Sequence, residues 1–232
     1  MLDNESHLIL CQHGERRIAR LNAALSHPQS KFITLADTYD DKPFNSPNDL
    51  DIDRAGNIYF TDPPYGQPKT KTAEIGINGV FKVAPSGAVT MLIDSLDRPN
   101  GIALSLDQKY LYIKKMGVFD HKPKVLKLNL ETKKISTLFD GRKISEEYGG
   151  DFDGIKVHSS GNIFFSGGGG ILIVNPGGKL MARINFGNAT NCAFDKDEKY
   201  LYVTGHLDNP KVFRIRLKNS INIGKSIKIQ TH

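Results

Sequence analysis

The sequence has 232 residues, of which 39% are hydrophobic and 24% are charged, so it is long and apolar enough for one large globular domain and its composition excludes intrinsic disorder. The formal net charge is +6, but lysines such as Lys114, Lys115, Lys133 and Lys134 are interpreted as solvated loop and strand-edge residues, so we expect no nucleic-acid partner. No apolar run approaches the roughly 20 residues of a membrane span, and the first residues lack the features of a signal peptide, so we expect no membrane partner and a cytoplasmic location.

In chain order, the first predicted elements are two strands within 7–21 and a third within 31–37. The stretch SPNDLDIDRAGNIYFTD at 46–62 then predicts two strands joined by a turn, with Asn48 as its polar head residue. The same pattern returns at 98–113, 151–166 and, more weakly, 190–205, with Asn100, Asp153 and Asn191 as heads. Further strands are predicted at 79–83, 90–93, 125–130, 135–139, 171–174 and 180–184, and one short helical turn at 144–150.

Repeats of several short strands, at roughly 40 to 50 residues each, are typical of β-propeller blades. A β-sandwich also has frequent turns but does not need this internal repetition. We therefore predict an all-β propeller as a single domain over residues 1–232. The four heads predict four blades, and the headless strands of 7–37 predict a partial fifth. The last residues, 220–232, are expected to pair with the last blade or to fill part of the gap.

The repeated Asn and Asp heads are candidates for a metal site. The first strand of each blade lines the central channel of a propeller, so equivalent heads converge around its axis. Amide and carboxylate oxygens from Asn48, Asn100 and Asp153 suit a hard divalent cation such as Ca²⁺. The alternative is that each head only caps its own turn, as an Asn followed by Gly commonly does. Asn191 has the weaker pattern, because neither Gly nor Asp follows it.

The heads and their flanking strands resemble the gluconolactonase / senescence marker protein / luciferin-regenerating enzyme family over residues 7–217. The stretches that carry the resemblance are SPNDL and GNIYFTDPPYG, then RPNGIALSLDQKYLYI, FDGIKV with GNIFFS, and TNCAFDKDEKYLYVTG. The resemblance implies a six-bladed propeller, here without its first blade and part of its second, and a divalent-metal lactonase site. It places the two channel-lining asparagines of the family at Asn48 and Asn100. The metal-binding aspartate, which is also the candidate general base, falls at Asp153.

Four further residues lie on segments that we expect at the channel mouth, and we predict that they bind substrate: His13, Arg16, Asp62 and Tyr65. Each has a structural alternative. His13 and Asp62 would form hydrogen bonds within turns, Arg16 would be a strand-edge charge, and Tyr65 would pack on the prolines before it.

The sequence departs from the family in one respect, because the early Glu-Gly-Pro segment, whose glutamate is the remaining protein ligand, is missing. The resemblance implies a metal-dependent hydrolase that opens a sugar lactone, with Ca²⁺ as the expected cation and Zn²⁺, Mg²⁺ or Mn²⁺ as alternatives. The alternative functions are a non-catalytic propeller that acts as a binding module, and a related metal-dependent esterase or phosphotriesterase. The expected partner is a small-molecule lactone or ester, and the sequence sets no oligomeric state.

Overall fold

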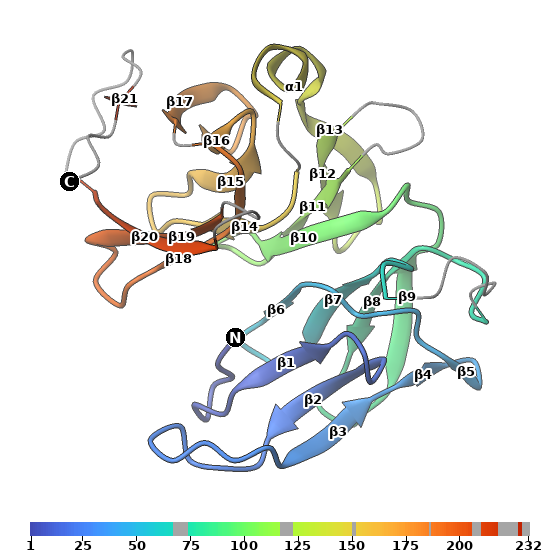
Figure 1. The fold of residues 1–232 in the computed structure, drawn as a ribbon. Coiled ribbons are helices and arrows are strands. Elements are labelled where there is room, and N and C mark those ends of the chain that lie inside the picture. Colours follow the sequence, from blue (N-terminus) through green and yellow to red (C-terminus); the bar gives the residue numbers. More distant parts are fainter. Residues whose placement is uncertain are drawn as a thin grey trace. The chain divides into compact units, whose positions relative to one another are not determined.

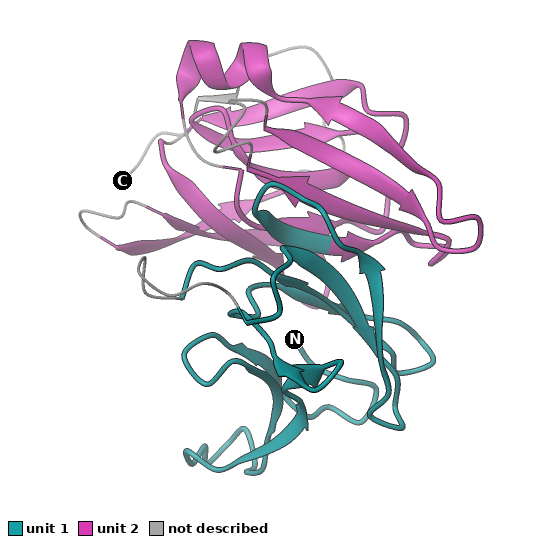
Figure 2. Cartoon of the chain, turned by 90° about the vertical axis from the view of Figure 1, so that its right-hand side faces the viewer, with its two compact units in different colours: residues 1–102 teal, residues 103–232 magenta. Residues whose placement is uncertain are grey.

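The structure is a computed structural model that describes residues 1–66, 74–116, 123–149, 152–185, 187–205, 210–217 and 227–228. The chain divides into two compact units, Met1–Ile102 and Ala103–His232 (Figure 2). Nearly all regular structure is β, as the sequence predicts (Figure 1). Within the described ranges, no helix combines the length and the apolar character that crossing a membrane requires.

The first unit consists mainly of two antiparallel sheets (Figure 1). The headless strands of the sequence form one of them, with β1 (Ile9–Gln12), β2 (Arg17–Leu21) and β3 (Phe32–Ala36). A hairpin of β4 (Thr38–Tyr39) and β5 (Lys42–Pro43) leads to the other sheet, with β6 (Leu50–Ile52), β7 (Ile58–Asp62), β8 (Gly79–Val83) and β9 (Val89–Ile93). Sequential antiparallel strands joined by turns have the topology of propeller blades. The strands predicted in this part of the chain are confirmed.

The turn between β6 and β7 shows why each repeat carries polar and glycine residues. The Oδ1 atom of Asp53 accepts the backbone N–H groups of Ala55 at 2.9 Å and Asn57 at 2.8 Å. Gly56 has a φ of +83°, in the left-handed region that favours glycine. This side-chain cap and this glycine reverse the chain within a few residues, so β6 and β7 are held in register.

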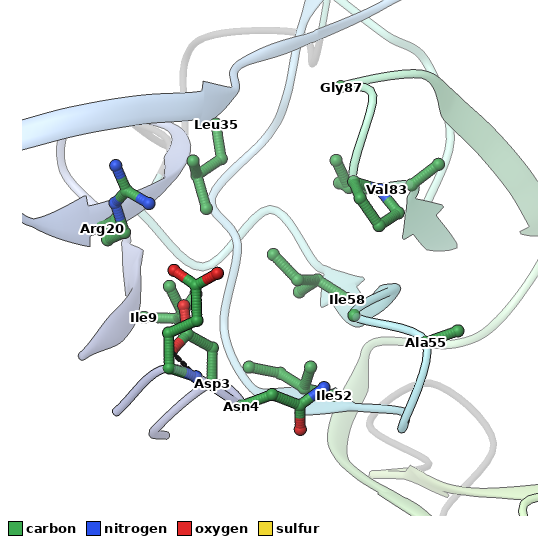
Figure 3. A pocket seen from close by; sticks show the side chains of 14 residues that line it. Asp3, Asn4, Ile9, Arg20, Leu35, Ile52, Ala55, Ile58, Val83 and Gly87 are labelled. Carbon is green, nitrogen blue, oxygen red and sulfur yellow. Dashed lines mark hydrogen bonds between the residues drawn. The ribbon is translucent and has the colours of Figure 1, made fainter. Parts of the chain in front are cut away.

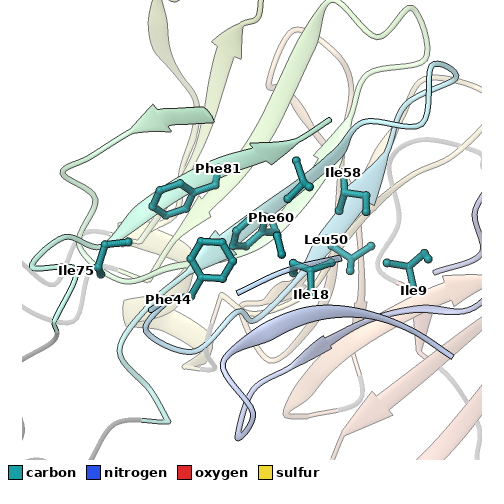
Figure 4. Packing of buried hydrophobic residues seen from close by; sticks show 10 residues of the cluster. Ile9, Ile18, Phe44, Leu50, Ile58, Phe60, Ile75 and Phe81 are labelled. Carbon is teal, nitrogen blue, oxygen red and sulfur yellow. The ribbon is translucent and has the colours of Figure 1, made fainter. Parts of the chain in front are cut away.

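A buried hydrophobic cluster packs the two sheets of the first unit together (Figure 4). The rings of Phe60 and Phe81 stack with their centroids 5.4 Å apart, and Phe44 meets Phe60 edge-on at 4.9 Å. All three side chains are fully buried. Ile9 and Ile18 from the β1–β3 sheet belong to the same cluster. Burial of such large side chains is the main stabilising term for a small unit of this kind.

The boundary between the units falls inside β10 (Pro99–Leu104), after Ile102. Its sheet has the order β10-β11-β12-β13, with β11 (Tyr110–Lys115), β12 (Lys124–Asn129) and β13 (Ile135–Asp140). The short helix α1 (Arg142–Tyr148) follows and confirms the predicted helical turn.

Two more sheets complete the second unit. One contains β14 (Ile155–Val157), β15 (Ile163–Gly167), β16 (Gly170–Val174) and β17 (Leu180–Asn185), and the other β18 (Ala189–Phe194), β19 (Tyr200–Gly205) and β20 (Lys211–Arg216). Of the C-terminal segment predicted at 220–232, only β21 (Ile227–Lys228) is described. It pairs in parallel with β17 and not with the last sheet, and the other residues of that segment lie outside the described residues.

Lys114 corrects the interpretation of the lysines as solvated residues. Lys133 and Lys134 are exposed, as expected, and Lys115 is half-buried. Lys114, near the end of β11, has no exposed surface at all. A buried ammonium group is tolerated only where hydrogen bonds replace its water shell, and three oxygen atoms take that role here. The strand pattern alone does not show these acceptors, because they come from residues far along the chain.

Candidate functional site

Asn48 lies two residues before β6, at the start of the blade. Its backbone N–H donates to the carbonyl oxygen of Thr61 at 2.9 Å, which fixes the main chain of the head against the end of β7. The side chain is half-buried, and its amide forms no hydrogen bond with any residue that the structure describes. The head therefore does not cap its own turn, and its amide oxygen is available to a ligand.

Thr61 links the two asparagine heads of the first unit. Its hydroxyl donates to the carbonyl oxygen of Asn100 at 2.7 Å, while its own carbonyl receives the N–H of Asn48. Asp49 adds a second link, because its Oδ2 atom accepts the N–H of Ile102 at 3.2 Å. Thr61 is fully buried and Asn100 is 5% exposed. The structure thus brings Asn48 and Asn100 together at one end of their strands.

Sequence reasoning missed Thr61 and Asp49, although Thr61 had a signal. Thr61 is a buried hydroxyl that follows the apolar residues Ile58, Tyr59 and Phe60 of β7. A polar residue in a buried strand needs a partner, and here the partner lies on the first strand of the next sheet.

Asp62 holds the loop that leads to Asn48. Its side chain is fully buried, and its two carboxylate oxygens accept the backbone N–H groups of Asn45 at 2.7 Å and Ser46 at 2.8 Å. Burial raises the pKa of Asp62 to about 7, although the two N–H groups and the charge of Arg16 oppose that rise. The hydrogen bonds of Asp62 thus run to a loop 16 and 17 residues earlier in the chain and not within its own turn, and its contact with a substrate stays a prediction.

This carboxyl group is expected to make folding pH-dependent. Its pKa is about 7 in the folded chain and 3.8 as an ordinary aspartate, so between these values the folded chain retains a proton that the unfolded chain releases. The free energy of unfolding should therefore fall, by an amount on the order of a few kcal/mol, as the pH rises from about 4 to about 7. Urea unfolding at several pH values in this range gives the free energy of unfolding as a function of pH. This free energy should fall less steeply with pH in Asp62→Asn than in the wild-type chain. An equal slope in both would assign the dependence to other groups.

Arg16 anchors the same loop from the turn between β1 and β2. Its guanidinium donates to the carbonyl oxygen of Phe44 at 2.5 Å and to that of Pro43 at 3.3 Å, and forms an ion pair with Glu74 at 2.7 Å. These contacts are more specific than those of a strand-edge charge, and they fix the chain just before Asn45. Contact of Arg16 with a substrate stays a prediction.

His13 and Tyr65 lie in the same region of the first unit. The hydroxyl of Tyr65 donates to the carbonyl oxygen of Arg98 at 3.2 Å, two residues before Asn100. The ring of His13 lies so close to Gly66 that a Cβ atom there would come within 2.6 Å of it. Gly66 also donates its N–H to the hydroxyl of Ser46 at 2.9 Å. Both predicted substrate residues are thus near the asparagine heads, on loops that follow β1 and β7.

Asp153 belongs to the second unit and is half-buried. Its backbone N–H donates to the hydroxyl of Ser166 at 2.9 Å. The glycine after it lets Asn191 approach closely, because a Cβ atom at Gly154 would lie 2.1 Å from the side chain of Asn191. The third and fourth heads are therefore neighbours in this unit. Because Asn48 and Asn100 belong to the first unit, the ring that joins all three predicted ligands stays a prediction.

The predicted ligands of the divalent cation are all oxygen donors. Among the residues that the structure describes, no three or more His, Cys, Asp or Glu side chains gather into a metal centre. The predicted set is of another composition, with two amides and one carboxylate. Such oxygen donors suit Ca²⁺ or Mg²⁺, and the uncommitted amide of Asn48 fits this use.

A cavity of about 400 Å³ lies elsewhere in the first unit (Figure 3). Ile58 and Val83 contribute apolar surface, and Asp3 and Arg20 contribute polar groups. Ile52, at the far end of β6 from the Asn48 head, also lines it. The cavity is therefore separate from the asparagine heads.

Known proteins match this chain in sequence and in structure. The family described as the SMP-30/Gluconolactonase/LRE-like region matches residues 1–206. A gluconolactonase of Zymomonas mobilis is 34% identical over 197 residues, which cover 79% of this chain and 54% of that protein. A solved gluconolactonase structure from Xanthomonas campestris has a TM-score of 0.76 at 29% identity, and covers 88% of this chain and 67% of that chain.

A regucalcin from Agrobacterium tumefaciens, a calcium-binding protein, has a TM-score of 0.68 at 22% identity over 90% of this chain and 68% of that one. At this identity the likeness shows the fold alone. The chain spans 54% of the length of the Zymomonas protein. The structural matches and the blade topology of the sheets confirm the propeller class and the expected four headed sheets with one headless sheet. With a family match over residues 1–206, the chain belongs to the SMP-30/gluconolactonase/LRE-like family.

Proposed function

We propose that this protein is a hydrolase of sugar lactones that uses a divalent cation, Ca²⁺ in the first place. The similarity to a gluconolactonase supports the substrate class. The observation that carries the site is the pair of hydrogen bonds by which Thr61 fixes Asn48 and Asn100 at one end of the first unit. Asn48, Asn100 and Asp153 would hold the cation.

The roles of the protein's own groups follow from their chemistry. A bound cation would supply positive charge that polarises the lactone carbonyl. The Oδ atoms of Asp153 would accept a proton from the attacking water and return it to the ring oxygen as the ester bond breaks, which is general acid–base catalysis by one carboxylate. The amides of Asn48 and Asn100 carry no charge, so they orient a ligand without adding a second base. His13 and Tyr65, on neighbouring loops of the first unit, are the candidates to bind sugar hydroxyls.

Removal of the cation tests this proposal. The chain is expected to hydrolyse an aldonolactone such as gluconolactone above the spontaneous rate, to lose that activity with a chelator, and to regain it when Ca²⁺ is restored. Acid release followed with a pH indicator measures the rate, and a blank without protein corrects for spontaneous opening. Hydrolysis unaffected by the chelator would contradict the cation's role. Ca²⁺ binding without hydrolysis would instead favour a binding module.

A further inference from the structure

Lys114 reaches from β11 to the strands that carry Asp153. Its Nζ atom donates to the carbonyl oxygen of Ser166 at 2.9 Å, to the hydroxyl of Ser166 at 3.1 Å and to the carbonyl oxygen of Gly154 at 3.2 Å. An ammonium group has three N–H donors, and these acceptors take the place of water around it. All of these residues belong to the second unit.

The surroundings of this ammonium group are apolar. Lys114 has no exposed surface, and its Nζ lies 5.2 Å from the ring centroid of Phe152 and 5.5 Å from that of Phe165. Burial of a charge is costly unless its hydrogen bonds are complete, and the hydrogen bonds themselves become stronger and more directional in a dry environment. A side chain held in this way fixes the groups that it contacts.

The contacted groups surround the backbone of Asp153. The hydroxyl of Ser166 that accepts from Lys114 also accepts the N–H of Asp153, at 2.9 Å. The carbonyl of Gly154, the next residue, accepts both from Lys114 and from the N–H of Ser166, the latter at 3.1 Å. The peptide group before the Asp153 Cα atom and the peptide group after the Gly154 Cα atom are therefore both tied to a single ammonium group.

The first unit has a matching arrangement. Thr61 lies at the end of β7, the second strand of its sheet, and bonds to Asn100, which is 39 residues further along the chain. Lys114 lies near the end of β11, the second strand of the next sheet, and bonds to Gly154, which is 40 residues further along. In both cases a buried polar side chain on one sheet contacts the backbone at the head of the following sheet, at Asn100 itself in one and at Gly154, next to the head, in the other.

We propose that Lys114 is a positioning residue for Asp153, which sets the direction of its carboxylate through Ser166 and Gly154. The positioning itself is independent of what Asp153 does. The consequence for catalysis rests on the proposed function.

Amide hydrogen exchange, measured by NMR on the whole chain, tests the positioning directly. Lys114→Met removes the three donors and keeps an apolar chain of similar length, and Lys114→Gln retains two donors in case the Met variant does not fold. Each is expected to lower the exchange protection of the Asp153 amide at least tenfold, with the amides of β1–β3 unchanged. Lys115→Met, the adjacent residue on β11, is the control and should leave the Asp153 amide protected. An unchanged Asp153 amide, or an equal fall throughout the second unit, would overturn the proposal.

A second readout separates this inference from the proposed function. Two quantities are measured in the wild-type chain and in Lys114→Met. Calorimetry gives the Ca²⁺ affinity, and a rate assay at saturating Ca²⁺ gives lactone hydrolysis. We expect at least a tenfold loss in affinity or in kcat, because misaligned supporting groups commonly cost this much at metal sites. If the wild-type chain neither binds Ca²⁺ nor hydrolyses lactones, the proposed function fails while the exchange experiment still decides the role of Lys114. If the wild-type chain is active and Lys114→Met equals it in both quantities, the catalytic consequence is wrong.

Discussion

Replacement of Asp153 by alanine is expected to abolish Ca²⁺ binding and lactone hydrolysis together. Asp153 is the only carboxylate in the predicted ligand set, and affinity for Ca²⁺ follows the charge of its ligands. It is also the proposed general base, so the same substitution removes the proton acceptor. Hydrolysis should fall by roughly a thousandfold or more, the scale for loss of a group that combines two such roles. Calorimetric titration with Ca²⁺ and a rate assay on the same preparation measure both effects.

The fourth head provides the control for this substitution. Asn191 is a neighbour of Gly154 and its Oδ1 atom accepts the N–H of Cys192 at 2.8 Å, so it has a partner of its own. Asn191→Ala should retain Ca²⁺ binding and most of the hydrolytic rate. Asp153→Asn keeps the shape of the side chain without its charge, and we expect it to resemble Asp153→Ala. If Asp153→Ala kept the full Ca²⁺-dependent rate, the assignment of this residue would be wrong.

Thr61→Val is expected to weaken Ca²⁺ binding and hydrolysis by roughly 10- to 100-fold, the range for residues that orient ligands from behind. Valine has nearly the same volume as threonine but cannot donate to the carbonyl oxygen of Asn100, which then remains buried without this partner. The Asn100 head should then lose its bond to residue 61, whose backbone carbonyl still holds Asn48, so the two heads are no longer held by the same residue. Titration with Ca²⁺ and the lactonase assay measure the change.

Thr61→Ser separates the hydrogen bond from packing. Serine retains the hydroxyl and loses only a methyl group, so Ca²⁺ affinity should stay within about threefold of the wild type while stability falls by about 1 kcal/mol. Equal effects of Val and Ser on Ca²⁺ affinity would show that the methyl group, not the hydroxyl, matters at this position.

The fold could be predicted largely from the sequence, because its signals are local. The turn at 53–57 closes through the side chain of Asp53, and alternating apolar residues mark the strands that follow. The internal repetition then identified the blades. The parallel pairing of β21 with β17 depends on where the chain end returns in space, so it gave no comparable local pattern.

The sequence indicates the heads of the candidate site but not the residues that hold those heads in place. Asn48, Asn100 and Asp153 recur at the same place in each repeat, so their alignment is visible in the sequence. Thr61 and Lys114 act on residues 39 and 40 positions away. Thr61 and Lys114 are different residue types, so the internal repetition does not reveal that they occupy similar positions. Lys114 in particular is of a residue type that is usually exposed, and its acceptors lie 40 and 52 positions further along the chain, where the strand pattern does not show them.

These links across successive sheets bear on how such repeats diversify. A hydroxyl group forms the link in one pair of sheets and an ammonium group forms it in the other. Each second strand is therefore specific to the head region that follows it. A gene duplication or exchange that copied one blade from its first strand to its last would separate each linking side chain from the head region that it contacts. The segment that keeps a linking side chain together with its acceptor therefore does not coincide with one blade. It extends from the second strand of one sheet to the first strand of the next.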